Sequence, residues 1–297
     1  MLDDRREERP KFDSLLPSEM AVKATDVGTA KAHLDTVTLF VLAFLAGAFI
    51  ALGAIFATTV AAGSGALPYG VARLLVGIAF SLGLILVVIA GAELFTGNTL
   101  IVMAWASGKV NTRLLLRNWL IVYLGNLVGA LGTVAVMFVS GQYLLGGGSV
   151  GLAALSTGNA KAGLDFLPAV ALGMMCNVLV CLAVWLTFSA RTTTDRIMAI
   201  VPPIAAFVAA GFEHSVANMY FIPIAMAIKG SASATFWTAI GKTPADFPAL
   251  TLDRFLLGNL LPVTIGNIIG GSVMVGAVYW FVYLRGHGWK RAAPAHD

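Results

Sequence analysis

Long apolar segments joined by short polar connections dominate the chain. They cover residues 37–62, 74–106, 118–140, 166–189, 197–228 and 255–284. Each is longer than the roughly 20 residues that an α-helix needs to cross a bilayer. The strict alternation of apolar and polar residues that is typical of transmembrane β-barrels is absent from them. The pattern therefore predicts an all-α membrane protein with six transmembrane helices.

Polar residues interrupt the second and the fifth of these segments. The second is interrupted at Glu93-Leu-Phe-Thr-Gly-Asn98, where Gly97 and Asn98 favour a turn or a left-handed residue. The fifth is interrupted at residues 211–218, Gly-Phe-Glu-His-Ser-Val-Ala-Asn. Irregular backbone at membrane depth is tolerated only where it is buried in protein or lines a cavity. We therefore expect helices 2 and 5 to be broken, each with a loop at a cavity.

The two halves of the chain repeat one another. Residues 118–129 match residues 259–270 at a constant offset of 141, and residues 90–98 match residues 210–218 at an offset of 120. The matched loop residues are Gly91, Glu93 and Asn98 with Gly211, Glu213 and Asn218. Because each repeat would hold three helices, an odd number, the two repeats insert upside down relative to each other. Inverted repeats with a broken helix in each half indicate a binding site near the midplane, where free N–H groups at helix N-termini suit a small anion.

Composition and charge support a membrane protein and orient it. Hydrophobic residues make up 58% of the chain and charged residues 11%, against about 25% charged residues in a soluble domain. Six spans place both termini on one side, and most lysines and arginines outside the spans belong to that side, so the positive-inside rule predicts cytoplasmic termini. We expect a cytoplasmic tail at 1–34, with a surface helix there as an alternative, a transmembrane domain at 35–285 and a second cytoplasmic tail at 286–297. The repeats would cover about 35–140 and 165–285.

His214 is the candidate chemical centre, because it is the only histidine within a predicted span. A charge at the centre of a spanning helix costs about 2.5–3.5 kcal/mol, which favours a role in a solute or proton pathway. An imidazole titrates near neutral pH and could protonate a weak-acid anion, or it could supply only a hydrogen bond or positive potential. A structural histidine is the alternative. Glu213 also has two interpretations. It could be a proton relay, or it could, like Glu93, accept hydrogen bonds that hold the loops open.

Three further polar residues have both functional and structural interpretations. Thr96 offers a hydroxyl at the first interruption. Asn267 is a candidate for the pore, whereas helix packing explains its repeat mate Asn126. Lys161 lies outside the predicted spans and is either a solvated loop charge or a cation that attracts anions to the pore mouth.

The sequence carries no signature of an enzyme. Cys176 and Cys181 are five positions apart and form no CxxC pair, so we interpret them as small apolar helix residues. Glu213-His214 does not belong to an HExxH metal motif. We therefore predict no catalytic activity, no cofactor and no bound metal.

Three motifs resemble those of the formate/nitrite transporter family. They are Glu93-Leu-Phe-Thr-Gly-Asn98, the segment 211–219 with Pro223, and the segment 259–271. The similarity extends from about residue 35 to 285, and residues 80–86 and 181–185 are most similar to the formate channel branch. The resemblance implies an aquaporin-like protomer with one pore, assembled as a homopentamer in the bacterial inner membrane.

The resemblance also implies roles for individual residues. Phe80, Leu84 and Phe207 match apolar constrictions, and Leu94, Phe95 and Thr96 match a mobile loop at the cytoplasmic constriction. The polar residues of the pathway would be His214, Thr96, Lys161 and Asn267, supported by Asn177 and Glu213. In such a pore Lys161 would draw the anion into a vestibule, and His214 would meet it between the constrictions.

We therefore predict a passive or proton-coupled channel for small monovalent weak-acid anions, with formate as the first choice. Nitrite or hydrosulfide is the alternative within the family, and acetate and lactate are further candidate solutes. The expected partners are membrane lipid, further copies of the chain and a cytoplasmic enzyme at the N-terminal tail, but no nucleic acid. A neutral-solute pore of the aquaporin type, which would lack pH dependence, and a non-transporting scaffold or sensor are alternatives from other classes.

Overall fold

The computed structural model of the chain describes residues 14–286, and every regular element within them is a helix. The parts of the predicted tails at 1–13 and 287–297 lie outside the described residues. Five helices are long and apolar enough to cross a bilayer: α2 (Thr36–Ala61), α3 with its π-helical continuation η2 (Tyr69–Leu86 and Val87–Gly91), α6 (Thr112–Val139), α8 (Phe166–Ser189) and the last helix, Arg254–Tyr283. The last helix comprises η6 (Arg254–Leu260), α12 (Leu261–Ile268), η7 (Ile269–Ala277) and α13 (Val278–Tyr283). The prediction of an all-α membrane protein is confirmed.

The second apolar segment is divided into two helical parts. Its first part ends at Gly91, whose φ of 82° lies in the left-handed region that glycine adopts without strain. The chain is extended at Ala92 and Leu94 and becomes helical again in α4 (Phe95–Asn98), η3 (Thr99–Ile101) and α5 (Val102–Ala106). The prediction that Gly97 and Asn98 form the turn is wrong, because both residues are helical and the left-handed residue is Gly91.

The fifth apolar segment is also divided, into α9 (Thr193–Ala209) and α10 (Ser215–Ser231). Gly211 has a φ of 78° and takes the place that Gly91 has in the first half. Asn218, which the sequence placed at the interruption, lies in the first turn of α10. Each of the two helices has 17 residues.

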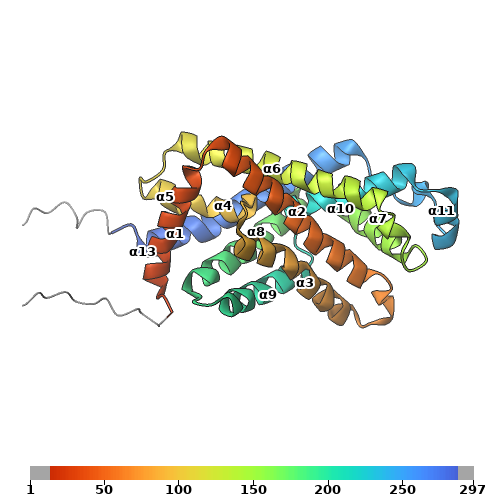
Figure 1. Cartoon of the computed structure of the whole chain (residues 1–297), viewed down its shortest axis with the longest axis horizontal. Helices are drawn as coiled ribbons and strands as arrows, with labels where there is room; N and C mark the ends of the chain where they lie inside the picture. Colours follow the sequence, from red (N-terminus) through yellow and green to blue (C-terminus); the bar gives the residue numbers. More distant parts are fainter. Residues whose placement is uncertain (1–13, 287–297) are drawn as a thin grey trace, which may run out of the picture.

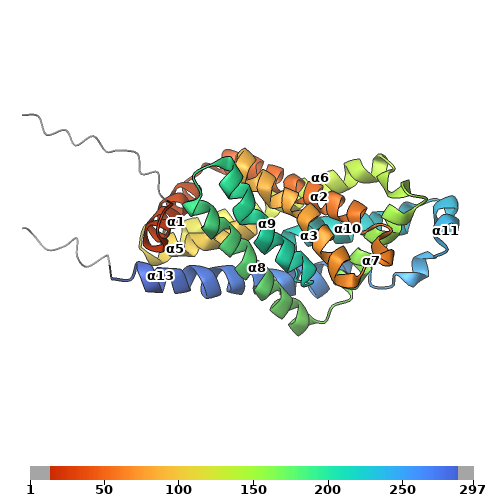
Figure 2. The ribbon, with the colours of Figure 1, turned by 90° about the horizontal axis from the view of Figure 1, so that it is seen from below.

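Within residues 14–286, three α-helices lie outside the predicted spans. The N-terminal helix α1 (Pro17–Ala32) packs against α5, α6, α8 and η3, and α7 (Ser149–Ala162) packs against α10 and α2. The third, α11 (Ala234–Ile240), follows α10. Figure 1 shows α1, α5 and α13 at one end of the bundle and α7 and α11 at the opposite end, and Figure 2 shows the same separation. The segment between α6 and α8 lies outside the predicted spans, but η4 (Gln142–Leu144) and α7 make it largely helical.

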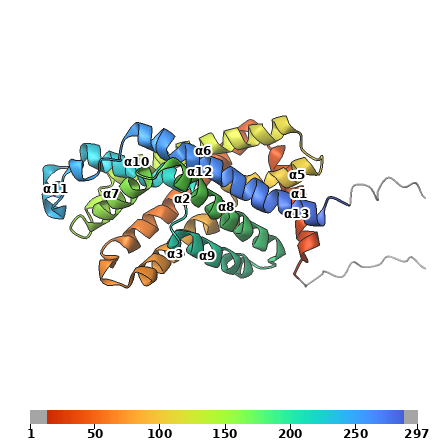
Figure 3. The same cartoon turned by 180° about the vertical axis from the view of Figure 1, so that it is seen from behind.

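Glycines allow the helices of the repeated segment to cross closely. A Cβ on Gly129 of α6 would overlap the backbone oxygen of Phe44 in α2, and a Cβ on Gly270 would overlap that of Met174 in α8. Small residues at such crossings let two backbones approach in lipid. The last helix crosses α8, which it contacts mainly through α12 and η7 (Figure 3). These two crossings bring α6 and the last helix next to the two interruptions, which form the site described below.

Candidate functional site

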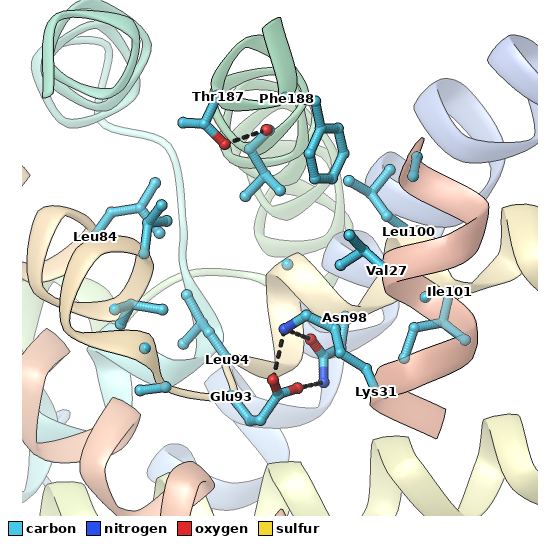
Figure 4. A pocket seen from close by; sticks show the side chains of 18 of the residues that line it. Val27, Lys31, Leu84, Glu93, Leu94, Asn98, Leu100, Ile101, Thr187 and Phe188 are labelled. Carbon is cyan, nitrogen blue, oxygen red and sulfur yellow. Dashed lines mark hydrogen bonds and ion pairs between the residues drawn. The ribbon is translucent and has the colours of Figure 1, made fainter. Parts of the chain in front are cut away.

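A buried carboxylate stabilises the first interruption. Glu93 Oε1 accepts a hydrogen bond of 2.7 Å from Lys31 Nζ of α1, and Oε2 accepts one of 2.7 Å from Asn98 Nδ2. Asn98 Nδ2 also donates to Asn118 Oδ1 at 2.9 Å, and Asn118 Nδ2 donates to the backbone oxygen of Lys31 at 3.1 Å. The close-up shows Lys31, Glu93 and Asn98 joined in this way (Figure 4). We call these four residues the first network.

The second interruption carries equivalents of these four contacts. Glu213 Oε1 accepts from Lys161 Nζ at 2.7 Å, and Oε2 accepts from Asn218 Nδ2 at 2.7 Å. Asn218 Nδ2 donates to Asn259 Oδ1 at 2.7 Å, and Asn259 Nδ2 donates to the backbone oxygen of Lys161 at 2.9 Å. In this second network Lys161 is a helical residue of α7 that is ion-paired with Glu213, so its interpretation as a solvated loop charge is wrong. These contacts make Glu213 a hydrogen-bond acceptor at the second interruption, and the proton relay stays a prediction.

Two asparagines fix the extended backbone of the interruptions. Asn126 Oδ1 accepts from Phe95 N at 2.9 Å, and its Nδ2 donates to the backbone oxygens of Ala43 and Glu93. Asn267 repeats this arrangement, because its Oδ1 accepts from Ser215 N at 2.9 Å and its Nδ2 donates to two backbone oxygens. Both side chains are completely buried. Asn267 therefore holds a loop in the same manner as Asn126 and lines neither of the two large cavities described below.

His214 joins the two interruptions. It is the N-cap residue of α10, and its Nδ1 accepts the backbone N–H of Ala217 at 3.0 Å. Because Nδ1 is an acceptor there, the ring proton is assigned to Nε2. Nε2 lies 2.9 Å from Thr96 Oγ1 of α4 and donates to it. The cap thus fixes the ring with its N–H directed at the Thr96 hydroxyl.

The backbone behind Thr96 is held from α8. Asn177 Nδ2 donates to the backbone oxygens of Thr96 and Asn267, and it also lies 3.1 Å from Thr99 Oγ1. Cys181 Sγ lies 3.3 Å from the same hydroxyl. Asn177 is completely buried, joins the backbone of Thr96 to that of the last helix, and lines neither of the two large cavities described below.

Two cavities of similar size approach this centre from opposite ends. The α1-side cavity has a volume of about 420 Å³, and its lining includes Lys31, Glu93 and Leu94 (Figure 4). The α7-side cavity has a volume of about 450 Å³, and its lining includes Lys161 and His214. Thr96 lines neither cavity and is fully buried. The pair of His214 and Thr96 therefore lies in the barrier between the two cavities.

The predicted constriction residues divide between these cavities. Phe80 and Phe207 line the α7-side cavity with ring centroids 5.7 Å apart, and Phe207 stacks on the His214 ring at 6.0 Å. Leu84 and Leu94 line the α1-side cavity. Phe95 lines neither, because its ring packs edge-on against Trp119 and Tyr123 of α6.

The sequence interpretation missed Lys31, Asn118 and Asn259 as site residues. The signal was present, because Ala30-Lys31-Ala32-x-Leu34-Asp35 matches Ala160-Lys161-Ala162-x-Leu164-Asp165 at an offset of 130. This match makes Lys31 the counterpart of Lys161, and the structure gives the two lysines equivalent carboxylate partners. Between residues 14 and 286 no group of three or more His, Cys, Asp or Glu side chains is placed to hold a metal ion.

Comparison with known proteins places this geometry among membrane channels. Residues 18–281 match the sequence profile described as formate/nitrite transporter. The chain is 49% identical to the formate channel FocA of Escherichia coli (strain K12) over 274 residues, covering 92% of this chain and 96% of the relative. It is 42% identical to FocA of Haemophilus influenzae over 263 residues, covering 89% and 93%. The solved structure described as a pentameric formate channel with formate bound superimposes with a TM-score of 0.80 at 49% identity, covering 84% of this chain and 98% of that chain.

Proposed function

The chain belongs to the formate/nitrite transporter family, and on this basis we propose that it forms a homopentameric channel for formate in the bacterial inner membrane. The identity to formate channels supports the substrate, and the similarity to a pentameric formate channel supports the assembly. The observation that carries the proposal is the hydrogen bond between His214 and Thr96 in the barrier between two cavities.

We further infer an aquaporin-like protomer of six spans in two inverted repeats, with the second and fifth spans broken. The two equivalent networks around Glu93 and Glu213 support this architecture, because each joins one interruption to a helix of its own half. The charge distribution favours cytoplasmic termini, which places the α1-side cavity at the cytoplasmic face. The α7-side cavity would then open to the periplasm.

In the proposed pathway an anion enters the α7-side cavity near Lys161. Lys161 is paired with Glu213, and its ammonium also lies 5.5 Å from the centre of the Phe221 ring. Beyond it the anion reaches the apolar rings of Phe80 and Phe207. A bare carboxylate is strongly disfavoured in such surroundings, whereas the neutral acid is tolerated. The barrier thus selects the protonated form of a small weak acid.

We propose that His214 delivers this proton. A ring that carries protons on both nitrogens could release the Nε2 proton to a carboxylate oxygen of the anion, which leaves the neutral ring protonated at Nδ1. Return to the tautomer in which Nδ1 accepts the Ala217 N–H then requires loss of the Nδ1 proton and uptake of a new proton at Nε2. The second proton would occupy Nδ1, which requires release of the Ala217 N–H that Nδ1 accepts here. The Thr96 hydroxyl, which accepts from Nε2, keeps its own hydrogen to donate to the same anion.

The test is formate uptake into proteoliposomes between pH 5 and 8, with nitrite and hydrosulfide as competitors. Flux of the neutral acid rises by up to about tenfold for each unit by which the pH falls. The variant His214→Asn keeps an oxygen that can accept the Ala217 N–H, but it does not titrate and its shorter side chain does not reach the position of Nε2. His33→Asn is the matched control, because the exposed His33 bonds only to a backbone oxygen of α1.

We expect steep pH dependence in the wild type and in His33→Asn, and its loss in His214→Asn. Unchanged flux of His214→Asn at every pH would reduce His214 to a hydrogen-bonding residue and would assign the proton to another source. If nitrite or hydrosulfide moves while formate does not, the substrate proposal is overturned, although the chain remains a channel of this family.

A further inference from the structure

The α1-side cavity carries cationic side chains that the proposed mechanism does not use. Lys23 of α1 and Arg196 of α9 line it, in addition to the ion pair between Lys31 and Glu93. Neither Lys23 nor Arg196 forms an ion pair with a carboxylate within residues 14–286. The two side chains therefore give this cavity an uncompensated positive charge.

The α7-side cavity is different. Its lysine, Lys161, is neutralised by Glu213, and the remaining cation that lines it is Arg73. The guanidinium of Arg73 donates to the backbone oxygens of Val208 and Ala209 at the end of α9. Arg73 thus satisfies the C-terminal carbonyls of a helix, whereas Arg196 is exposed to solvent.

Lys23 is held at the rim of the cavity. Its Nζ donates to the backbone oxygen of Phe188 at 2.9 Å, which fixes the ammonium and leaves two of its three N–H groups for other acceptors. Burial, followed by the nearby guanidinium groups of Arg196 and Arg191, lowers the pKa of Lys23. Like charges thus converge on this rim, and a bound anion would relieve their repulsion.

We propose that Lys23 and Arg196 form a docking site for small monovalent carboxylates at the mouth of the α1-side cavity. The site rests on the proposed function, because it would concentrate the transported anion at the entrance on the side of the termini. Clefts lined by one sign of charge raise the local concentration of the opposite ion and its rate of entry. Two cations within a Debye length, about 30 Å at 10 mM salt, act together on such an anion.

The test uses oriented membrane vesicles that contain the full-length pentamer. In inside-out vesicles the α1-side cavity faces the assay buffer, and in right-side-out vesicles the α7-side cavity does. We expect Arg196→Met and Lys23→Gln each to raise the half-saturating formate concentration about two- to five-fold in inside-out vesicles at 10 mM salt. The effect should fade at 1 M salt, where the Debye length is about 3 Å, and it should be small in right-side-out vesicles.

The controls separate docking from folding. Lys109→Met removes a positive charge whose partner, Asp26 of α1, is also exposed, and Lys109 does not line the cavity, so no change in half-saturation is expected. Arg196→Lys preserves the charge and should retain wild-type behaviour. The side chain of Arg196 makes no hydrogen bond within residues 14–286, so its variants leave the helix packing intact even if Lys23→Gln loosens α1.

Several outcomes would overturn the site. One is an unchanged half-saturating concentration in Arg196→Met at low salt, and another is an equal change in both vesicle orientations. If the half-saturating concentration of the variants rises in phosphatidylglycerol proteoliposomes but not in pure phosphatidylcholine, the two cations bind lipid headgroups instead. Failure of the proposed function itself looks different, because wild type would then show no formate flux in either orientation.

Discussion

Replacing Lys161 with methionine would leave the Glu213 carboxylate buried without its counter-charge. The two groups lie 2.7 Å apart, and their side chains are only 18% and 5% exposed. At an effective dielectric constant of 20 the attraction is about 6 kcal/mol, and desolvation of both groups opposes it. Removing one partner of a buried pair typically costs about 3–5 kcal/mol, because the remaining charge stays uncompensated.

Thermal denaturation of the detergent-solubilised pentamer measures this cost. At roughly 2–4 °C per kcal/mol, Lys161→Met should lower Tm by about 10 °C. The matched control is Lys109→Met, whose ion pair with Asp26 has a similar length, 2.8 Å, but side chains that are 44% and 63% exposed. An exposed pair contributes about 0–1 kcal/mol, so this Tm should fall by no more than about 3 °C.

A second variant identifies the cause. In K161M/E213Q the buried charge is gone, while the glutamine oxygen can still accept from Asn218 Nδ2. We therefore expect the double variant to melt above Lys161→Met. A Tm of Lys161→Met within about 3 °C of wild type, or a double variant that melts below the single one, would refute the reasoning.

Three further predictions follow from the same geometry. Asn267→Ala and Asn126→Ala each remove three hydrogen bonds to backbone groups at an interruption, including the one to the buried N–H of Ser215 or Phe95, and should each cost about 1–3 kcal/mol; a Tm shift in only one of them would contradict the equivalence of the two loops. Gly211→Ala forces a side chain to a φ of 78° and should cost about 1–2 kcal/mol, measured by the same melts; an unchanged Tm would show that the backbone relaxes. Hydrogen bonds from Thr192 and from the Arg191 backbone lower the pKa of Asp195, so its contribution is complete above about pH 5 and is lost as the pH falls through the folded pKa. Asp195→Asn should therefore melt below wild type at pH 7 and approach it below pH 4, and a gap that persists there would refute the assignment.

The apolar helices and the two interruptions could be predicted because their signals are local. Each long apolar run contains enough residues to cross a bilayer, and an ionisable residue in such a run stands out against its neighbours. His214 and Thr96 each belong to a motif of fewer than ten residues, 211–219 and 93–98. Their hydrogen bond, however, joins residues 118 positions apart and had to come from the structure.

The N-terminal helix could not be recognised in the same way. Its buried residues include Met20, Ala24, Gly28 and Ala32, one every four positions. This spacing is typical of a helix with a narrow packed face, but the residues are too small and too few to form an apolar run. The role of Lys31 likewise depends on Glu93, which lies 62 positions away.

Asn267 shows a different limit. An asparagine in an apolar helix suits a pore lining as well as a backbone clamp, and composition cannot separate the two. The distinction requires knowing where its amide hydrogens go, and here they go to the backbone oxygens of Gly173 and Glu213. The repeat mate Asn126 was interpreted as a packing residue. Because the two positions are equivalent in the repeat, the same interpretation would have described Asn267 better than a pore lining does.

The position of Lys31 also has a practical consequence for anyone who shortens this chain. Trimming the N-terminus as far as Ala32 would delete the counter-charge of Glu93 and the backbone oxygen that Asn118 Nδ2 requires. It would also remove one wall of the α1-side cavity. The resulting protein would lack two of the contacts that hold the first interruption. A loss of transport after such a deletion would therefore not show that the N-terminus acts as a gate or as a binding region for another protein.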